Sequence, residues 1–163
     1  MRVHRSHEFD ASIDACWAMF DDPESHVAKF TAMGHRELEV VEVEADEDHL
    51  RIVIDRLVDV EVPSFARKVF QPTNRVRSVD EWVRKDRTTC AGTFVLSTKG
   101  VPVEISGTTL LTGDGARSHY TIEVDVTVKV PLIGGRVAEV ARGIVDQQLT
   151  DEFRLGDDWL ARA

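Results

Sequence analysis

The chain has 163 residues, with 20 basic and 29 acidic side chains, and a formal net charge of −9. This length suits one domain with a sizeable core, so we expect residues 1–163 to form a single domain. The acidic balance disfavours nucleic acid as a partner. Residues 1–5 lack the apolar core of a signal peptide, and no run of about 18 apolar residues could span a membrane. We therefore expect a cytoplasmic protein.

The charge is distributed unevenly along the chain. Residues 36–61 carry ten acidic and three basic side chains, whereas residues 64–87 carry seven basic and three acidic ones. A locally basic face of this kind can meet an anionic ligand or make transient contact with a membrane surface.

The first 34 residues predict a strand followed by two short helices. Residues 2–9 alternate between two faces, as in a strand. Ser12 is placed to cap the first helix, and Asp22-Pro23 breaks it and begins the second. Gly34 is expected to end the second helix.

From residue 35 the apolar period changes to two, which predicts six further strands. The strand-like runs lie at about residues 38–43, 50–58, 75–84, 90–96, 101–111 and 120–130. Residues 61–74 do not alternate and predict a short helix or a lid-like loop. Asp114-Gly115 predicts a hairpin in which both residues adopt positive φ.

The last segment predicts one long amphipathic helix, from about Ile133 to Trp159. Its apolar side chains recur at intervals of three and four. They are Ile133, Val137, Val140, Ala141, Ile144, Val145, Leu149 and Phe153. Gly143 interrupts the helix, either to make room for a ligand or to pack closely against the strands. The elements together predict an α+β fold of order β-α-α-β6-α, with a seven-stranded antiparallel sheet wrapped around the C-terminal helix.

Several local segments strengthen this interpretation. They are Gly34-His35-Arg36, Pro63-Ser64-Phe65, Glu81-Trp82, residues 100–103 (GVPV) with 106–108 (SGT), and residues 130–135 (VPLIGG). With the order of elements they resemble the START-like helix-grip (SRPBCC) superfamily, and within it an uncharacterised bacterial family of unknown function. The resemblance implies strand order 1-7-6-5-4-3-2 and a cavity between sheet and helix. In related families such cavities hold lipids, sterols, polyketides or plant hormones.

The leading functional hypothesis is therefore the binding of a hydrophobic small molecule, lipid-like or polyketide-like, in that cavity. The candidate ligand-binding residues lie on the inward faces of the predicted strands and helix or in the loop near the cavity mouth. They are Ile54, Arg56, Phe65, Trp82, Phe94, Ile105, Tyr120, Ile122, Val140, Ile144 and Gln148.

Arg56 continues the inward phase of Leu50, Ile52 and Ile54. A buried guanidinium is costly unless it is paired, so an inward Arg56 needs a partner or an anionic ligand. The alternative is that the strand ends or bulges before Arg56 and leaves the side chain in water. The same two readings apply to His7 and Gln148.

Two other functions remain open. One is a polyketide cyclase or aromatase acting through His7, Arg56 or Tyr120, and the other is an interaction domain with a filled core and no ligand. Glu104 and Glu123 point outward by strand phase, so no inward pair of carboxylates is predicted. His4 and His7 fall on opposite faces of one strand and cannot share a metal ion. No catalytic residue, metal site or cofactor is predicted, and the oligomeric state is left open.

Overall fold

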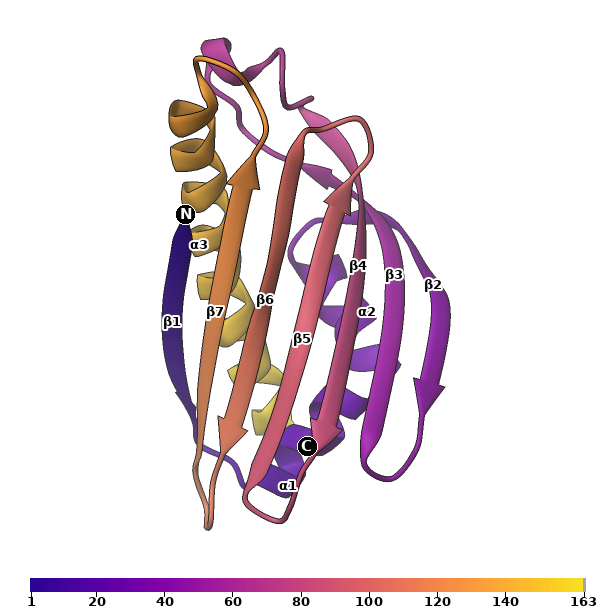
Figure 1. The fold of residues 1–163 in the computed structure, drawn as a ribbon. Coiled ribbons are helices and arrows are strands. Elements are labelled where there is room, and N and C mark those ends of the chain that lie inside the picture. The colour runs from indigo at the N-terminus through magenta and orange to yellow at the C-terminus, as the bar shows by residue number, and fades with distance from the viewer. Residues whose placement is uncertain (163) are drawn as a thin grey trace.

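The computed structural model describes residues 1–162 and shows one antiparallel sheet with its helices on one side. The elements in chain order are β1 (Arg2–Phe9), α1 (Ile13–Asp21), α2 (Pro23–Ala32), β2 (Arg36–Ala45), β3 (His49–Asp59), the 3₁₀ turn η1 (Ser64–Ala66), β4 (Thr73–Arg84), β5 (Thr89–Thr98), β6 (Val103–Thr112), β7 (Ser118–Val128) and α3 (Gly134–Arg162). The strand order is β1-β7-β6-β5-β4-β3-β2. The α+β helix-grip prediction is confirmed (Figure 1).

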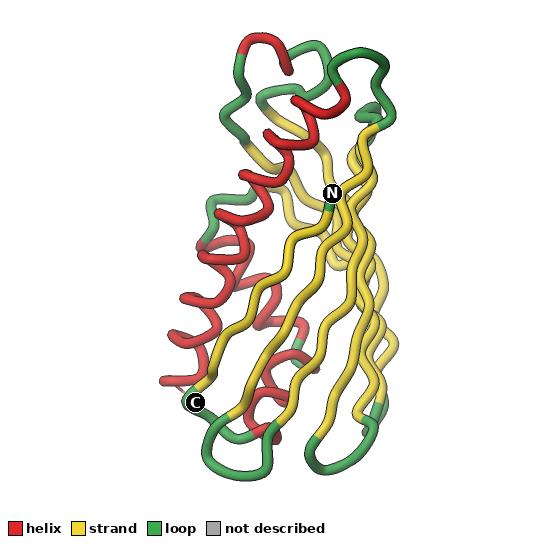
Figure 2. Tube along the Cα trace, turned by 60° about the vertical axis from the view of Figure 1, so that its left-hand side comes forward, coloured by secondary structure: helices red, strands yellow, loops and turns green. Residues whose placement is uncertain are grey.

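The long helix α3 runs along one face of the sheet, and α1 and α2 cover the same face near the end where α3 finishes (Figure 2). α3 packs against β1 and β7, and α2 packs against β2 and α3. The three helices therefore cover one face of the sheet. None of the helices within residues 1–162 is long and apolar enough to cross a membrane.

The predicted caps of the first two helices are present. The Ser12 hydroxyl accepts a hydrogen bond from the Ala15 amide at 3.2 Å, and the Asp22 carboxylate accepts one from the Glu24 amide at 2.9 Å. Pro23 occupies the first turn of α2, and Gly34 adopts a φ of 84° just after its end. These caps satisfy backbone groups that a short helix would otherwise leave exposed.

The core forms where the inward phase of the strands meets the apolar stripe of α3. In β7, Tyr120, Ile122, Val124 and Val126 are all buried. The buried side chains of α3 are Val137, Ala138, Ala141, Val145, Leu149 and Phe153. The sequence pattern placed most of this stripe correctly, but the helix begins at Gly134 rather than at Ile133.

Gly143 departs from both sequence interpretations. It is exposed on α3, and a Cβ atom placed there would meet nothing within 4 Å. Gly143 therefore neither packs against a strand nor faces the space beside the sheet. The turn of α3 that carries it presents its opposite side to the core, through Ala141 and Val145.

The hairpin between β6 and β7 also differs from the expected turn. β6 ends at Thr112 and β7 begins at Ser118, so the loop spans residues 113–117 rather than two residues. Neither Asp114 nor Gly115 has a positive φ, because a loop of this length does not need the tight turn that requires it. A positive φ is found instead at Leu132, at 68°, in the loop between β7 and α3.

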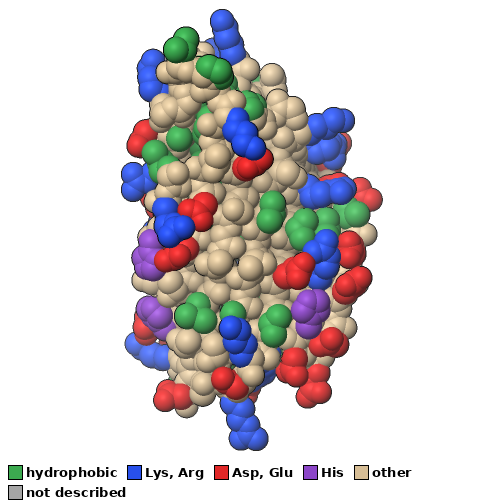
Figure 3. All heavy atoms as spheres, in the orientation of Figure 1, with side chains coloured by type: hydrophobic (Ala, Val, Ile, Leu, Met, Phe, Trp, Pro, Cys, Tyr) green, Lys and Arg blue, Asp and Glu red, His purple; other side chains and the backbone are tan. Residues whose placement is uncertain are grey.

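The outer face of the sheet is turned toward solvent. Isolated hydrophobic side chains lie there among charged and polar ones (Figure 3). Val83, Val95 and Leu110 are exposed, and ion pairs such as Arg77–Asp55 and Lys129–Glu104 lie at the surface. Scattered exposed apolar groups of this kind are ordinary on a protein surface.

A candidate ligand-binding channel along α3

Three adjoining chambers lie in series along α3, between the helices and the sheet. The outer chamber, about 110 Å³, lies between α1, α2 and the C-terminal half of α3. The middle chamber, about 90 Å³, lies under the centre of the sheet, and the apolar chamber, about 70 Å³, lies beside the N-terminal half of α3. Phe20, Tyr120 and Glu152 border both the outer and the middle chamber. Arg56 and Gln148 border both the middle and the apolar chamber.

The chambers therefore follow α3 from Ala141 to Arg162, about 30 Å of helix. Each is smaller than ligand pockets of roughly 300–1,000 Å³, but together they approach the lower end of that range. Each is also several times larger than the space needed for one water molecule. The space between sheet and helix thus contains a row of adjoining hollows, which are together called the channel here.

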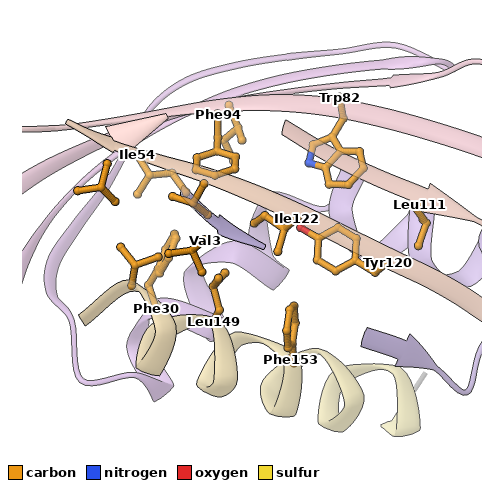
Figure 4. Close-up of a cluster of buried hydrophobic side chains, with 14 of the residues drawn as sticks. Val3, Phe30, Ile54, Trp82, Phe94, Leu111, Tyr120, Ile122, Leu149 and Phe153 are labelled. Atoms are coloured by element: carbon orange, nitrogen blue, oxygen red, sulfur yellow. The ribbon is translucent and has the colours of Figure 1, made fainter. Parts of the chain in front are cut away.

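Aromatic side chains form the wall where the outer and middle chambers meet. The Phe20 ring lies 4.6 Å from that of Trp82 and 5.5 Å from that of Tyr120, and the Phe153 ring lies edge-on to Tyr120 at 5.9 Å. Figure 4 shows Trp82, Tyr120 and Ile122 extending from the sheet toward Phe153 on α3. These rings present apolar surface to the channel and hold one another in place.

Two glycines let large rings lie flat against the sheet. Gly92 pairs with Trp82 on the neighbouring strand, and a Cβ at Gly92 would come within 3.0 Å of the indole ring. Gly107 pairs with Phe94, and a Cβ there would overlap the Phe94 ring. A side chain at either glycine would push its ring into the channel and narrow it.

Arg56 is the most deeply buried charge of the channel, with only 3% of its surface exposed. Its Nε donates to His35 Nδ1 at 3.2 Å, and its Nη1 donates to the Ser78 hydroxyl at 2.9 Å. The guanidinium lies 3.8 Å from the centre of the Phe30 ring. Burial, together with the adjacent Arg56 charge, lowers the pKa of His35 to about 4, so His35 is neutral at pH 7 and accepts this hydrogen bond.

Two carboxylates face the middle chamber as well. Burial raises the pKa of Asp80 to about 6, while the charges of Lys29 and Arg56 act in the opposite direction. Glu152 of α3 pairs with Lys29 of α2 at 3.2 Å. The expectation of no inward carboxylate pair, which considered only Glu104 and Glu123, is therefore wrong.

The hydroxyl-bearing side chains of Thr109 and Tyr120 also border the middle chamber. Thr109 Oγ1 is buried and has no hydrogen-bond partner among residues 1–162. The Tyr120 hydroxyl lies in the interior (Figure 4), and burial raises the pKa of Tyr120 well above its usual value, with Glu152 and Asp80 adding to the effect. Tyr120 is thus a neutral hydrogen-bond donor over the whole physiological pH range.

Most of the predicted ligand-binding residues come together here. Those that border the middle or apolar chamber are Arg56, Trp82, Phe94, Ile105, Tyr120, Ile122, Ile144 and Gln148. Ile54, Phe65 and Val140 do not border any of the three chambers. Ile54 is fully buried in the core, and Val140 is half-buried on α3. Phe65 stacks under the Arg136 guanidinium at 4.0 Å, beyond the end of the channel.

For Arg56, Gln148 and His7 the sequence left open whether the side chain faces inward or lies in water, and the structure gives a separate answer for each. β3 continues without a break to Asp59, so the reading that leaves Arg56 in water is wrong. Gln148 is half-buried and borders two chambers. His7 borders none of the three chambers, and its Nε2 contacts Asp157 at 2.9 Å on the outer side of α3.

Sequence reasoning missed Asp80, Glu152 and Lys29. Asp80 lies two residues before Trp82 and so shares its inward strand phase, a signal that was present in the sequence. Glu152 follows Gln148 by one helical turn. Only the packing of α2 against α3 brings Lys29 to it, and no local pattern predicts that contact.

Together these features define a protein with the START-like helix-grip fold: a seven-stranded sheet that packs around a long C-terminal helix. The chain belongs to the family described as "Protein of unknown function (DUF2505)", whose model matches residues 4–160. Among curated proteins none matches the sequence.

Solved structures share the fold over nearly the whole chain. The Zhui aromatase/cyclase from Streptomyces sp. R1128 is 15% identical, with a TM-score of 0.72 over 99% of this chain and 94% of its own. A START superfamily protein from Mycobacterium smegmatis is 14% identical, with a TM-score of 0.56 over 99% and 97%. The human StarD13 (DLC2) lipid transfer and protein localization domain is 12% identical, with a TM-score of 0.61 over 95% and 76%. At these identities the likeness concerns the fold.

Proposed function

We propose that the protein binds a hydrophobic small molecule in the channel between the sheet and α3. The observation that carries this proposal is the combination of aromatic and aliphatic walls with a few converging polar groups, among them Arg56, Asp80 and Tyr120. Concave, mostly apolar sites with a small number of placed polar groups are typical of small-molecule sites.

The chambers favour a binding protein over a domain with a filled core. A packed interior leaves voids scarcely larger than a water molecule, whereas each chamber here has a volume of at least about 70 Å³. A buried Thr109 hydroxyl without a partner is also costly in a dry core. The human domain of the same fold is described as a lipid transfer domain, which agrees with a lipid-like occupant.

The proposal is tested by titrating the purified protein with the neutral apolar dye N-phenyl-1-naphthylamine and following its fluorescence. We expect saturable binding of one dye per folded chain, and displacement of the dye by 1-dodecanol. Fluorescence that persists after urea unfolding, or that never saturates, would contradict binding in a folded channel.

A second function, cyclisation of a polyketide-like substrate, is favoured by Asp80. A carboxyl with a pKa of about 6 is suited to accept a proton near neutral pH, and it shares the middle chamber with Arg56 and Tyr120. Incubation with a synthetic β-polyketone chain would then give an aromatic product, detected by mass spectrometry. The reaction should be lost in Asp80→Asn, a variant that keeps the shape of the side chain.

A further inference from the structure

The guanidinium of Arg56 has hydrogen-bonding capacity that the protein does not use. Arginine offers five N–H donors, and Arg56 makes two hydrogen bonds to side chains, to His35 and to Ser78. Only 3% of the Arg56 surface is exposed, so its remaining donors have little contact with bulk water. Arg56 borders both the middle and the apolar chamber, and so lies at their junction.

The positive charge of Arg56 also lacks a direct counterion. Within residues 1–162 no carboxylate oxygen lies within 4 Å of its guanidinium nitrogens, whereas Lys29 and Glu152, which border the same chamber, are paired with each other at 3.2 Å. Its two hydrogen-bond partners are a neutral imidazole and a hydroxyl, which carry no charge to balance it. Leaving a buried charge without a counterion is costly, and a bound anion would remove that cost.

The other charged groups around Arg56 limit the negative charge that this anion can carry. Asp80 of β4 faces the same chamber, Glu152 of α3 is paired with Lys29 of α2, and Asp55 lies on the outer side of β3, paired with Arg77. Two nearby carboxylates disfavour a group with two negative charges, such as a phosphate monoester. A carboxylate carries one charge and matches the planar fork of an arginine.

The surroundings of the junction indicate where the rest of the molecule lies. The chamber beyond Arg56 is lined mainly by aliphatic and aromatic side chains, including Val58, Phe70 and Ile144. Its volume of about 70 Å³ is small, which suits a single hydrocarbon chain better than a fused ring system.

We propose that the ligand is a single-chain aliphatic carboxylic acid, with its carboxylate held by the free N–H groups of Arg56 and its chain in the apolar chamber. This inference rests on the proposed function, since it names the class of molecule that the same channel takes. It assigns Arg56 the role of selecting an acid over a neutral molecule of equal length.

The test compares dodecanoate with 1-dodecanol, which share one chain length and differ in the charged head. Both are titrated by displacement of N-phenyl-1-naphthylamine from the wild type, Arg56→Met and the control Arg77→Met. Arg77 lies on the outer face of the neighbouring strand and is exposed. We expect Arg56→Met to lose about tenfold or more in dodecanoate affinity, the range for hydrogen bonds to a charged group. Its dodecanol affinity should change less than about twofold, and Arg77→Met should change neither affinity.

The outcomes separate this inference from the function on which it rests. Equal losses for acid and alcohol in Arg56→Met, or no loss for either, would overturn the role of Arg56 while leaving a hydrophobic ligand in place. Failure of both molecules to displace the dye from the wild type would count against the proposed function itself.

If Arg56→Met does not fold, Arg56→Lys decides, because it keeps the charge but not the planar fork. A loss of about threefold or more for dodecanoate alone would support the proposal, and an unchanged dodecanoate affinity would contradict it.

Discussion

The Lys29 ammonium lies 3.2 Å from the Glu152 carboxylate and joins α2 to α3 where the outer chamber meets the middle chamber. Both side chains are partly exposed, 21% for Lys29 and 31% for Glu152. Both residues border both chambers, so the pair lies where the two chambers adjoin. An ion pair at this place is positioned to influence how an apolar molecule reaches the middle chamber.

Lys29→Met should speed the entry of the apolar dye. The change removes the ion pair but keeps a side chain of similar length. The electrostatic contact between α2 and α3 is therefore lost, while the shape of the chamber lining changes little. Stopped-flow fluorescence should show a faster association rate, with a stability cost of about 1 kcal/mol or less for a partly exposed pair. Lys129→Met, which breaks a lysine–glutamate pair on the outer face, serves as the control. Equal association rates in both variants would show that the Lys29 pair does not limit entry.

Ile144→Trp should block the apolar chamber without unfolding the protein. Ile144 is half-buried and borders that chamber, so an indole has empty space to enter. We expect weaker binding of 1-dodecanol in dye displacement and a melting temperature close to that of the wild type. The same substitution at fully packed positions typically costs about 1–3 kcal/mol, and a loss of that size at Ile144 would show that the chamber is filled.

Gly143→Ala should stabilise the protein by about 0.5–1 kcal/mol, the difference between the two residues in a helix interior. The position is exposed, and a methyl group there meets no neighbour. Gly107→Ala should have the opposite effect, because its methyl group would collide with the Phe94 ring and the Glu123 carbonyl. Urea unfolding of the two variants gives the comparison, and a destabilised Gly143→Ala would contradict the solvent-facing position of this residue.

Acid should destabilise the fold through two buried histidines. Burial lowers the pKa of both His26 and His35 to about 4, whereas an unfolded histidine titrates near 6.5. Between these values the unfolded chain binds more protons, so the free energy of unfolding falls as the pH drops from about 6.5 to about 4. Each unit of pKa difference corresponds to about 1.4 kcal/mol. Thermal melts over this range should show the loss, and it should be smaller in His35→Gln.

Asp80 has the opposite effect on stability from the two histidines over part of the same pH range. Its pKa is raised to about 6 from an ordinary value near 3.8, so between these values the folded protein holds the extra proton and gains stability as the pH falls. Asp80→Asn removes this contribution. The variant should therefore lose stability more steeply than the wild type between about pH 6 and pH 4, and an identical profile would count against the buried position of the Asp80 carboxyl.

The sequence predicted the fold well because its signals are local and periodic. The alternation of β7 and the apolar stripe of α3 fix the two surfaces that form the core, and the capping residues Ser12 and Asp22 fix the short helices. Arg56 could be placed on the inward face by the same alternation. Its partners could not, since His35 lies in the loop after α2 and Ser78 on β4, and only the folded sheet brings them to it.

The polar side of the channel was predicted least well. Lys29, Asp80 and Glu152 come from α2, β4 and α3, and no spacing along the chain relates them. The contact of Phe65 with Arg136 was not predicted either, because it depends on how the loop before β4 folds over the start of α3. Contacts between elements distant in sequence depend on packing rather than on local pattern.

The central claim is that a hydrophobic molecule lies between the sheet and α3, and methyl NMR of the labelled full chain tests it most directly. Ile105, Ile122 and Val145 border the middle chamber, whereas Val43, Val95 and Leu110 are exposed. On addition of 1-dodecanol we expect saturable shifts and intermolecular contacts at the first three residues and none at the exposed three. Contacts confined to the exposed residues, or an absence of saturable change at Ile105, Ile122 and Val145, would contradict the claim.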